Sequence, residues 1–347
     1  MAEPRPDPAW RRFAAWLLGT LGAGGALMAA ALLLLDPYGV SPVGLAKPRP
    51  LMDANQRWMY PQLVRHGGHD SLVIGTSTSR LLRPAELDAA FGGRFANLAL
   101  NAGLAAEQLR VLEAFRRANG PPRTLLVGLD AVWCDPGATP EGETFRGWPT
   151  WLWQGEGWGA VARTLNPRSL EIAARQLGLW LGVQRPRFDA DGFGDFTGGE
   201  AGWNLERARW HIWGGGPPGI RPEEPPADPS PAEVAGWRFP ALEWLDAALG
   251  GLPPGATRTL LVFMPVHVAA QPRPGSLAER REAACKAHAA EVAARHGALF
   301  QDHRIASPVT TDDALWWDSQ HWRIGLGPRL IAEMASALGA RQASAGR

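Results

Sequence analysis

The sequence predicts an α/β protein, a three-layer α/β/α sandwich with a parallel sheet, preceded by a transmembrane helix. Short runs rich in Val, Ile and Leu alternate with segments of helical periodicity, which is typical of a parallel sheet covered on both faces. Hydrophobic residues make up 46% of the 347 residues, so the chain can bury a substantial core. A long uncharged stretch near the N-terminus adds the transmembrane helix.

Residues 13–35 form an apolar stretch without a charge, long enough for a helix to cross a hydrocarbon core of about 30 Å. Basic residues precede it and an acidic residue follows it: Arg5, Arg11, Arg12 and Asp36. The positive-inside rule then places residues 1–12 in the cytoplasm and the rest of the chain in the periplasm or outside the cell. A cleaved signal peptide and a buried core helix are the alternatives. The length of the run and its ending in four leucines favour an uncleaved, single-pass anchor in the cytoplasmic membrane.

The elements after the anchor follow one another in a regular order. The expected parts are a tether at 36–52, an α/β domain at 53–340 and a tail at 341–347. The predicted strands are 71–74, 95–100, 124–129, 257–264 and 298–301. The predicted helices are 84–91, 105–119, 276–296 and 328–338. Pro84 marks the start of the helix at 84–91, and a capping box at Ser276 marks the start of the helix at 276–296. Gly120 marks the end of the helix at 105–119.

Residues 135–250 interrupt this alternation. Ten of the chain's 17 tryptophans lie between Trp148 and Trp244, among Gly- and Pro-rich stretches. We expect an insertion over the catalytic face, partly helical near 169–182 and 231–249. Trp is a common sugar-stacking residue, so a carbohydrate cleft is one interpretation. Packing of an irregular subdomain or contact with the membrane interface is favoured.

The charge and the cysteines bear on partners and cofactors. A net charge of +1 gives no electrostatic basis for a nucleic-acid partner. Cys134 and Cys285 match no zinc or redox spacing, and they form either one disulfide or two buried thiols, of which we favour the thiols. His66 and His69 have no further ligands at useful spacing, so a solvated loop is favoured over a metal site. We expect no metal and no organic cofactor.

A Gly-Thr-Ser turn ends in Ser77 directly after the strand at 71–74, and Asp318-x-x-His321 lies near the end of the chain. These residue types are the components of a Ser-His-Asp hydrolase. The histidine would remove the proton of Ser77, and the aspartate would hold the imidazole in the required tautomer. The alternatives are caps at Ser77 and Asp318 and a histidine packed among tryptophans. Ser79 is the second candidate nucleophile.

Together, these motifs resemble the SGNH/GDSL hydrolase superfamily, in particular its membrane-anchored bacterial branch of polysaccharide O-acyl esterases and transferases. The resemblance covers residues 71–133 and 257–338 and leaves the insertion unmatched. It implies that Ser77 is the nucleophile and that Asp318 and His321 complete the triad.

The resemblance also implies an oxyanion hole formed by the backbone N–H groups of Ser77 and Gly103. The third block of the family is Gly-x-Asn-Asp, but this chain reads Gly-Leu-Asp at 128–130. An ionised Asp130 cannot donate a hydrogen bond and would repel an oxyanion. Either Asn101 replaces the missing donor, or Asp130 is structural, or the hole has two donors. A plain turn glycine is the alternative for Gly103.

Two further residues are candidates for supporting roles. Arg80 binds an anionic group or pairs with an acidic surface residue. His267 follows a strand end on the face where ligands bind, which makes it a candidate neighbour of the triad.

By resemblance, we expect a serine esterase that removes O-acyl groups from an envelope or exported polysaccharide, with an acylated carbohydrate or a small ester as substrate. One alternative is an O-acyltransferase that works with a membrane acyl donor protein. The other is a non-catalytic scaffold that binds a glycan or a partner, which the departure at Asp130 encourages.

Overall fold

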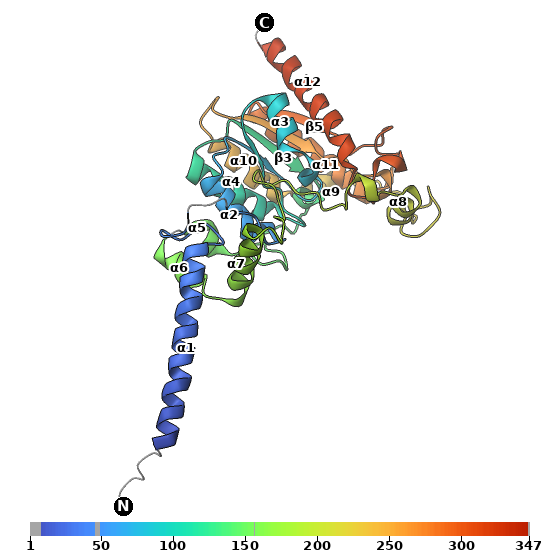
Figure 1. Ribbon diagram of the computed structural model, residues 1–347. Coiled ribbons are helices and arrows are strands. Elements are labelled where there is room, and N and C mark those ends of the chain that lie inside the picture. The colour runs from blue at the N-terminus through green and yellow to red at the C-terminus, as the bar shows by residue number, and fades with distance from the viewer. Residues whose placement is uncertain (1–7, 46–48, 156, 346–347) are drawn as a thin grey trace, which may run out of the picture. The chain divides into compact units, whose positions relative to one another are not determined.

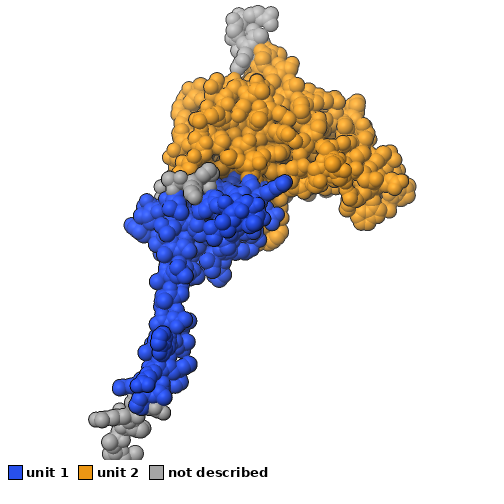
Figure 2. Space-filling view, viewed as in Figure 1, with its two compact units in different colours: residues 1–54, 149–187 blue, residues 55–148, 188–347 orange. Residues whose placement is uncertain are grey.

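The computed structural model shows an α/β fold with a five-stranded parallel sheet (Figure 1). It describes residues 8–45, 49–155 and 157–345. The chain forms two compact units (Figure 2): unit 1 contains residues 1–54 and 149–187, and unit 2 contains residues 55–148 and 188–347. This division differs from the predicted single domain at 53–340, because part of the insertion packs with the N-terminal segment.

Unit 1 is built from helices. They are α1 (Pro8–Leu35), α5 (Thr150–Gln154), α6 (Trp158–Arg163) and α7 (Pro167–Trp180). Among the described residues, α1 is the one helix long and apolar enough to cross a membrane, and most of its side chains are exposed. Arg11 and Arg12 lie within its first turns, whereas Arg5 lies outside the described residues. The helix therefore begins before the predicted start at residue 13.

The predicted tether at 36–52 is packed rather than loose wherever the structure describes it; residues 46–48 lie outside the described part. Asp36 Oδ1 accepts hydrogen bonds from two following backbone N–H groups, at 2.8 and 2.9 Å. Tyr38 is fully buried and meets the ring of Trp151 edge-on, with centroids 5.9 Å apart. The segment therefore belongs to the core of unit 1, which its Pro- and Gly-rich composition did not indicate.

The sheet lies in unit 2. Its strands are β1 (Ser71–Ile74), β2 (Phe95–Asn97), β3 (Thr124–Leu129), β4 (Arg258–Phe263) and β5 (Leu299–Asp302). They are parallel, in the order β2-β1-β3-β4-β5. The sequence order reverses between β1 and β3, and ligands of open α/β sheets bind at the carboxyl ends of strands beside such a reversal. The five predicted strands are confirmed, although β2 ends at Asn97 instead of residue 100. Beyond this end, the N–H groups of Leu98 and Leu100 still donate to the carbonyls of Val73 and Gly75, both at 2.9 Å.

Helices alternate with these strands along the chain in the predicted order, with additions. They are α2 (Gln56–His66), α3 (Pro84–Phe91), α4 (Ala105–Asn119), α8 (Leu205–Ile212), α9 (Pro231–Gly236), α10 (Pro240–Gly250), α11 (Leu277–Arg295) and α12 (Gly327–Ala345). Helix α2 was not predicted because Pro61 interrupts its pattern, yet Asn55 caps its first turn. Helix α12 continues into the predicted tail at 341–347, where Arg341 donates to the carbonyl of Ala298.

The two cysteines form a disulfide, so the prediction of two buried thiols is wrong. Cys134 ends the 3-10 helix η2 (Ala131–Cys134), which follows β3, and Cys285 lies on α11. A separation of 151 residues hides the contact between η2 and α11 from any local sequence pattern. The bridge ties the segment after the carboxyl end of β3 to a long helix.

Candidate active site

Ser77 lies at the tip of a tight turn between β1 and the 3-10 helix η1 (Ser79–Leu81). The carbonyl of Thr76 accepts hydrogen bonds from the N–H groups of Ser79 (3.1 Å) and Arg80 (3.3 Å), which closes the turn. From residue 71 to residue 82, Ser77 is the one residue that is not buried. The turn therefore presents a single hydroxyl at the carboxyl edge of the sheet.

Ser79, the second candidate nucleophile, is excluded by its burial. Its side chain is fully buried against the ends of β1 and β3. A Cβ added at Gly75 would come within 2.3 Å of Ser79 Oγ, and one at Gly128 within 1.8 Å. Glycine at these two positions therefore makes room for Ser79, which packs the base of the turn.

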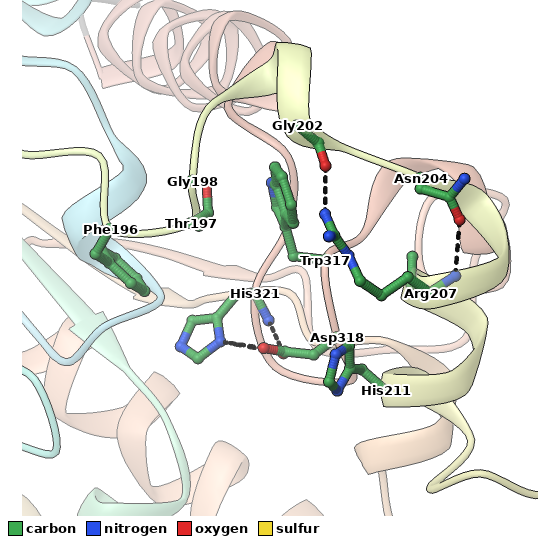
Figure 3. Close-up of a pocket in the computed structure, with 11 residues that line it drawn as sticks. Phe196, Thr197, Gly198, Gly202, Asn204, Arg207, His211, Trp317, Asp318 and His321 are labelled. Carbon is green, nitrogen blue, oxygen red and sulfur yellow. Dashed lines mark hydrogen bonds and ion pairs between the residues drawn. The ribbon is translucent and has the colours of Figure 1, made fainter.

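His321 and Asp318 meet Ser77 in one hydrogen-bonded line. Nε2 of His321 lies 2.8 Å from Ser77 Oγ. Nδ1 lies 2.8 Å from Oδ2 and 3.1 Å from Oδ1 of Asp318, a pair drawn in Figure 3. When Nδ1–H donates to the carboxylate, Nε2 keeps a lone pair that can accept the serine proton.

The Asp318 carboxylate is held in its ionised form. It accepts hydrogen bonds from the backbone N–H groups of Gln320 (2.7 Å) and His321 (2.8 Å) as well as from the imidazole. Burial alone would raise the pKa of Asp318, but the hydrogen bond from His321, the charge of that ring and the two backbone donors lower the pKa below its usual value. An anion at this position stabilises the imidazolium that forms when His321 takes a proton.

Aromatic side chains fix the loop that carries His321. Trp316 and Trp322 flank the motif, are fully buried and pair through an antiparallel bridge. The N–H of Trp317 donates to the carbonyl of His321 at 2.8 Å. Phe196 meets the imidazole ring edge-on, with centroids 5.2 Å apart. These contacts limit rotation of the imidazole away from Ser77.

Asn101, the residue expected to replace the missing oxyanion donor, is held by two buried arginines. Arg80 Nη1 donates to Oδ1 of Asn101 at 2.6 Å, and Arg57 Nη1 donates to its backbone carbonyl at 3.2 Å. Arg57 is itself held by Glu107, with Nε–Oε1 at 2.7 Å. With Oδ1 occupied, the amide NH₂ of Asn101 is the group that remains to donate. Neither it nor the N–H of Ser77 has a hydrogen-bond partner among the described residues.

Gly103 does not fit the expected role. Its N–H donates to the carbonyl of Leu100 at 3.0 Å, so that donor is already used within the turn. A Cβ at this position would lie 2.8 Å from Cβ of Leu100. Gly103 is therefore a turn glycine. Of the expected oxyanion donors, the N–H of Ser77 and the amide of Asn101 are the two without a partner among the described residues.

Arg80 does not pair with a surface carboxylate, as one sequence interpretation suggested. It is buried, and its guanidinium stacks over the rings of Phe196 (4.5 Å to the centroid) and Phe188 (5.3 Å). Nη2 donates to the carbonyl of Gly194 at 3.2 Å. Phe196 also contacts His321, and Arg80 also binds Asn101. The insertion residues bound by Arg80 therefore lie next to both His321 and Asn101.

Asp130, where an Asn was expected, supports the turn that carries Ser77. Its carboxylate accepts hydrogen bonds from the hydroxyl of Thr76 and from the N–H of Val132 (3.1 Å). Burial raises the pKa of Asp130 despite these two donors. A carboxyl group that is bound and shifted toward its neutral form repels a nearby oxyanion less than a free carboxylate would. Asp130 is thus structural in this fold.

His267 contacts the loop that carries His321 through its backbone and through its ring, which meets Trp316 edge-on with centroids 5.8 Å apart. Its N–H donates to the carbonyl of Ser319 at 3.0 Å. The ring is buried, with Nε2 3.1 Å from Asp313 and Nδ1 accepting from the N–H of Ala269 at 3.1 Å. Burial lowers the pKa of His267 although Asp313 opposes the shift. The residue positions the loop that carries Asp318.

A pocket of about 670 Å³ opens beside the triad. Its lining residues are Phe196, Thr197, Gly198, Gly202, Asn204, Arg207, Ala208, His211, Trp317, Asp318 and His321 (Figure 3). Most of them come from the insertion, and sequence reasoning missed them. The available signals were the Asn204 cap before a short amphipathic helix and the position of Trp317 directly before the Asp-x-x-His motif.

The described residues contain no group of three or more His, Cys, Asp or Glu side chains arranged to hold a metal ion. His69, one of the two histidines weighed as a metal ligand, has its pKa lowered by burial, although the nearby backbone of Ala190 and the charge of Asp191 oppose the shift.

Comparison with protein-family models gives no match. Comparison with curated proteins gives none either, so the description of this site depends on its geometry.

Proposed function

We propose that the protein is a serine esterase that removes O-acyl groups from a saccharide through an acyl-enzyme. The observation that carries the proposal is the line from Ser77 Oγ through His321 to Asp318, with 2.8 Å at each step. Three groups at these distances, with a half-buried hydroxyl at a turn tip, are the requirements of nucleophilic catalysis by serine.

The proposed reaction has two halves. His321 Nε2 takes the proton of Ser77 while Oγ forms a bond to the acyl carbon. The N–H of Ser77 and the amide of Asn101 stabilise the oxyanion, and each such donor is typically worth about 3 kcal/mol in the transition state. The imidazolium then protonates the leaving sugar oxygen. Water repeats the sequence on the acyl-enzyme and releases the acid.

An SGNH-like sandwich is the fold that these features support. The nucleophile follows β1, and the Asp-x-x-His motif follows β5, the last strand. Helices fall into two contact groups: α3 contacts α12, whereas α4 contacts α2 and α10, which in turn contacts α11. We infer that one group covers each face of the sheet.

We also infer that unit 2 lies outside the cytoplasm. The apolar helix α1 and the arginines at its start favour a single pass with the N-terminus inside. The disulfide between Cys134 and Cys285 supports the same orientation, because such bonds persist in oxidising compartments. A reporter that is active only outside the cytoplasm, fused to the C-terminus, should be active; a silent fusion would refute this orientation.

Release of acid from an acylated sugar tests the function. Full-length protein in detergent should liberate acetate from a sugar acetate, and the Ser77→Ala variant with an unchanged melting temperature should not. Adding a free sugar acceptor distinguishes hydrolysis from transfer, since a transferase would form new sugar ester faster than free acetate. Absence of both products from the folded wild-type protein would favour a non-catalytic scaffold.

A further inference from the structure

The pocket beside His321 lies on the leaving-group side of the proposed reaction. A histidine that acts as general acid must reach the oxygen of the departing alcohol. The pocket is lined by His321, Asp318 and Trp317, whereas the proposed oxyanion donor Asn101 is not among its lining residues. A ligand in this pocket therefore occupies the place of the alcohol part of the ester, and the acyl part lies elsewhere.

We propose that this pocket binds a sugar that bears an anionic group, a carboxylate or a phosphate, as the alcohol part of the substrate. The inference rests on the proposed esterase function and specifies its substrate class. The pocket volume of about 670 Å³ is within the range of small-molecule sites and is large enough for a sugar unit.

Two side chains of α8 that can donate hydrogen bonds from N–H groups line the pocket. Arg207 and His211 are four residues apart and therefore lie on the same face of the helix, with the small Ala208 between them. The guanidinium of Arg207 donates to the carbonyl of Gly202, and its Nε and Nη1 have no partner among the described residues. An arginine with free donors is suited to bind carboxylate or phosphate oxygens.

No free carboxylate from the described residues lines the pocket to neutralise the positive charge of Arg207. Asp318 is the one carboxylate among the lining residues, and its oxygens are occupied by His321 and by backbone N–H groups. Two carboxylates on the adjoining loop have partners of their own. Thr197 donates to Asp195 at 2.6 Å, and Arg323 Nε donates to Glu200 at 2.8 Å.

Aromatic side chains complete the lining. Trp317 and Phe196 contribute rings to a pocket whose other lining residues are polar or small. Nε1 of Trp317 is buried and has no hydrogen-bond partner among the described residues. This N–H is closed off from the pocket, so a bound sugar would contact the rings of Trp317 and Phe196 and not the indole nitrogen.

Helix α8 is fixed in place, so the pocket is preformed. Asp313, in the 3-10 helix η5 (Asp313–Leu315), accepts from Arg209 Nε at 2.8 Å and from Trp213 Nε1 at 3.2 Å. Trp203 Nε1 donates to the carbonyl of Trp316 at 2.9 Å. These bonds attach the insertion to the segment that carries the catalytic loop.

The test compares two acetylated methyl hexosides that differ only at C6, where one has a carboxylate and the other a CH₂OH group. Full-length wild-type protein should show a kcat/KM about tenfold higher for the uronate ester, as expected for charge-assisted hydrogen bonds. The Arg207→Gln/His211→Gln double variant should lose this preference, so that its kcat/KM for the uronate ester falls to the value for the neutral ester. The control Arg280→Gln removes an exposed arginine that does not line the pocket and should keep the preference.

Salt and a second anion sharpen the outcome. The preference should shrink as ionic strength rises, because partly exposed ion pairs are screened. The third ester is an acetylated methyl hexoside that carries a phosphate at C6. Its kcat/KM, compared with that of the uronate ester, shows which anion the pocket binds better. Equal kcat/KM for all three esters would overturn the inference while leaving the esterase function intact.

Binding to the Ser77→Ala variant separates the two proposals. Ligand-observed NMR with the unacetylated methyl uronoside and methyl hexoside should show saturation transfer that favours the uronoside and depends on Arg207 and His211. If the wild type cleaves no ester but this binding is seen, the esterase proposal fails and the anionic sugar site stands. If binding shows no charge preference either, both are refuted.

Discussion

Nε2 of His321 lies 2.8 Å from Oγ of Ser77, although 244 residues separate them in the chain. The turn after β1 places the serine, and the loop after β5 places the histidine. Parallel strands bring both loops to the same edge of the sheet. A proton can pass directly between the two side chains in this arrangement, which is the basis of the proposed chemistry.

Replacing Asp318 by Asn should lower kcat by about 10³- to 10⁴-fold with little change in KM, because the amide favours the wrong imidazole tautomer and cannot stabilise the imidazolium. Asp312→Asn is the matched control, since an amide oxygen can still accept from the N–H of Ala314 as Asp312 does at 2.9 Å. Steady-state kinetics on a sugar acetate measure both. An equal loss in the two variants would show that Asp318 has no special role.

Removing the Asn101 side chain should lower kcat by about 10²- to 10³-fold, as for loss of one oxyanion donor. Arg80→Lys should also lower kcat, because an ammonium group cannot keep the bonds to Asn101 and Gly194 together. The Asn101→Ala/Arg80→Lys double variant should be no slower than Asn101→Ala alone. Additive losses in kcat would mean that Arg80 does not act through Asn101.

Asp130→Asn should be more stable than wild type at neutral pH, and the advantage should shrink on acidification. Burial raises the folded-state pKa of Asp130 above its unfolded value, so the native state binds the extra proton. Stability from that proton is fully present below the unfolded pKa of about 3.9 and is lost as pH rises through the raised folded pKa.

Thermal unfolding of both proteins between about pH 4 and pH 7 measures this difference. Val132 N–H donates to Oδ1 and the Thr76 hydroxyl to Oδ2 of Asp130. In the Asp130→Asn variant the amide oxygen can accept from Val132, and the amide NH₂ can donate to the Thr76 hydroxyl oxygen, so both contacts can persist. A gap in melting temperature that is constant over this range would contradict the assigned pKa direction.

Removing the disulfide with Cys134→Ser/Cys285→Ser should cost about 2–5 kcal/mol in the free energy of unfolding. The bridge closes a loop of 151 residues and secures η2 to α11. Urea unfolding of the detergent-solubilised protein measures the loss. Reductant should destabilise the wild type to the same degree and leave the double variant unchanged; a reductant-insensitive wild type would mean that the cysteines are unpaired.

The sequence was sufficient to predict the sheet and the three principal residues of the site. Strands such as Thr124–Leu129 are buried at every position, and their uninterrupted apolar runs show this directly. The triad followed from short motifs at strand ends. Burial of Ser79 was not predictable, because only the fold shows that Gly75 and Gly128 leave space for it.

Contacts between distant segments account for what was missed. The bonds of Arg80 to Asn101 and to the backbone of Gly194 join three separate stretches of sequence, and no periodicity marks them. No sequence periodicity marks the packed segment at 36–52 either. The same holds for α8, because its apolar face is short. Such features depend on tertiary packing, which overrides local propensity.

Active-site labelling tests the central claim most directly. A fluorophosphonate probe should modify full-length wild-type protein at one site, and mass spectrometry should map the adduct to Ser77. Folded Ser77→Ala should not be labelled, and Ser79→Ala, if folded, should still be labelled. No adduct on wild type, or an adduct that persists in Ser77→Ala, would contradict the account.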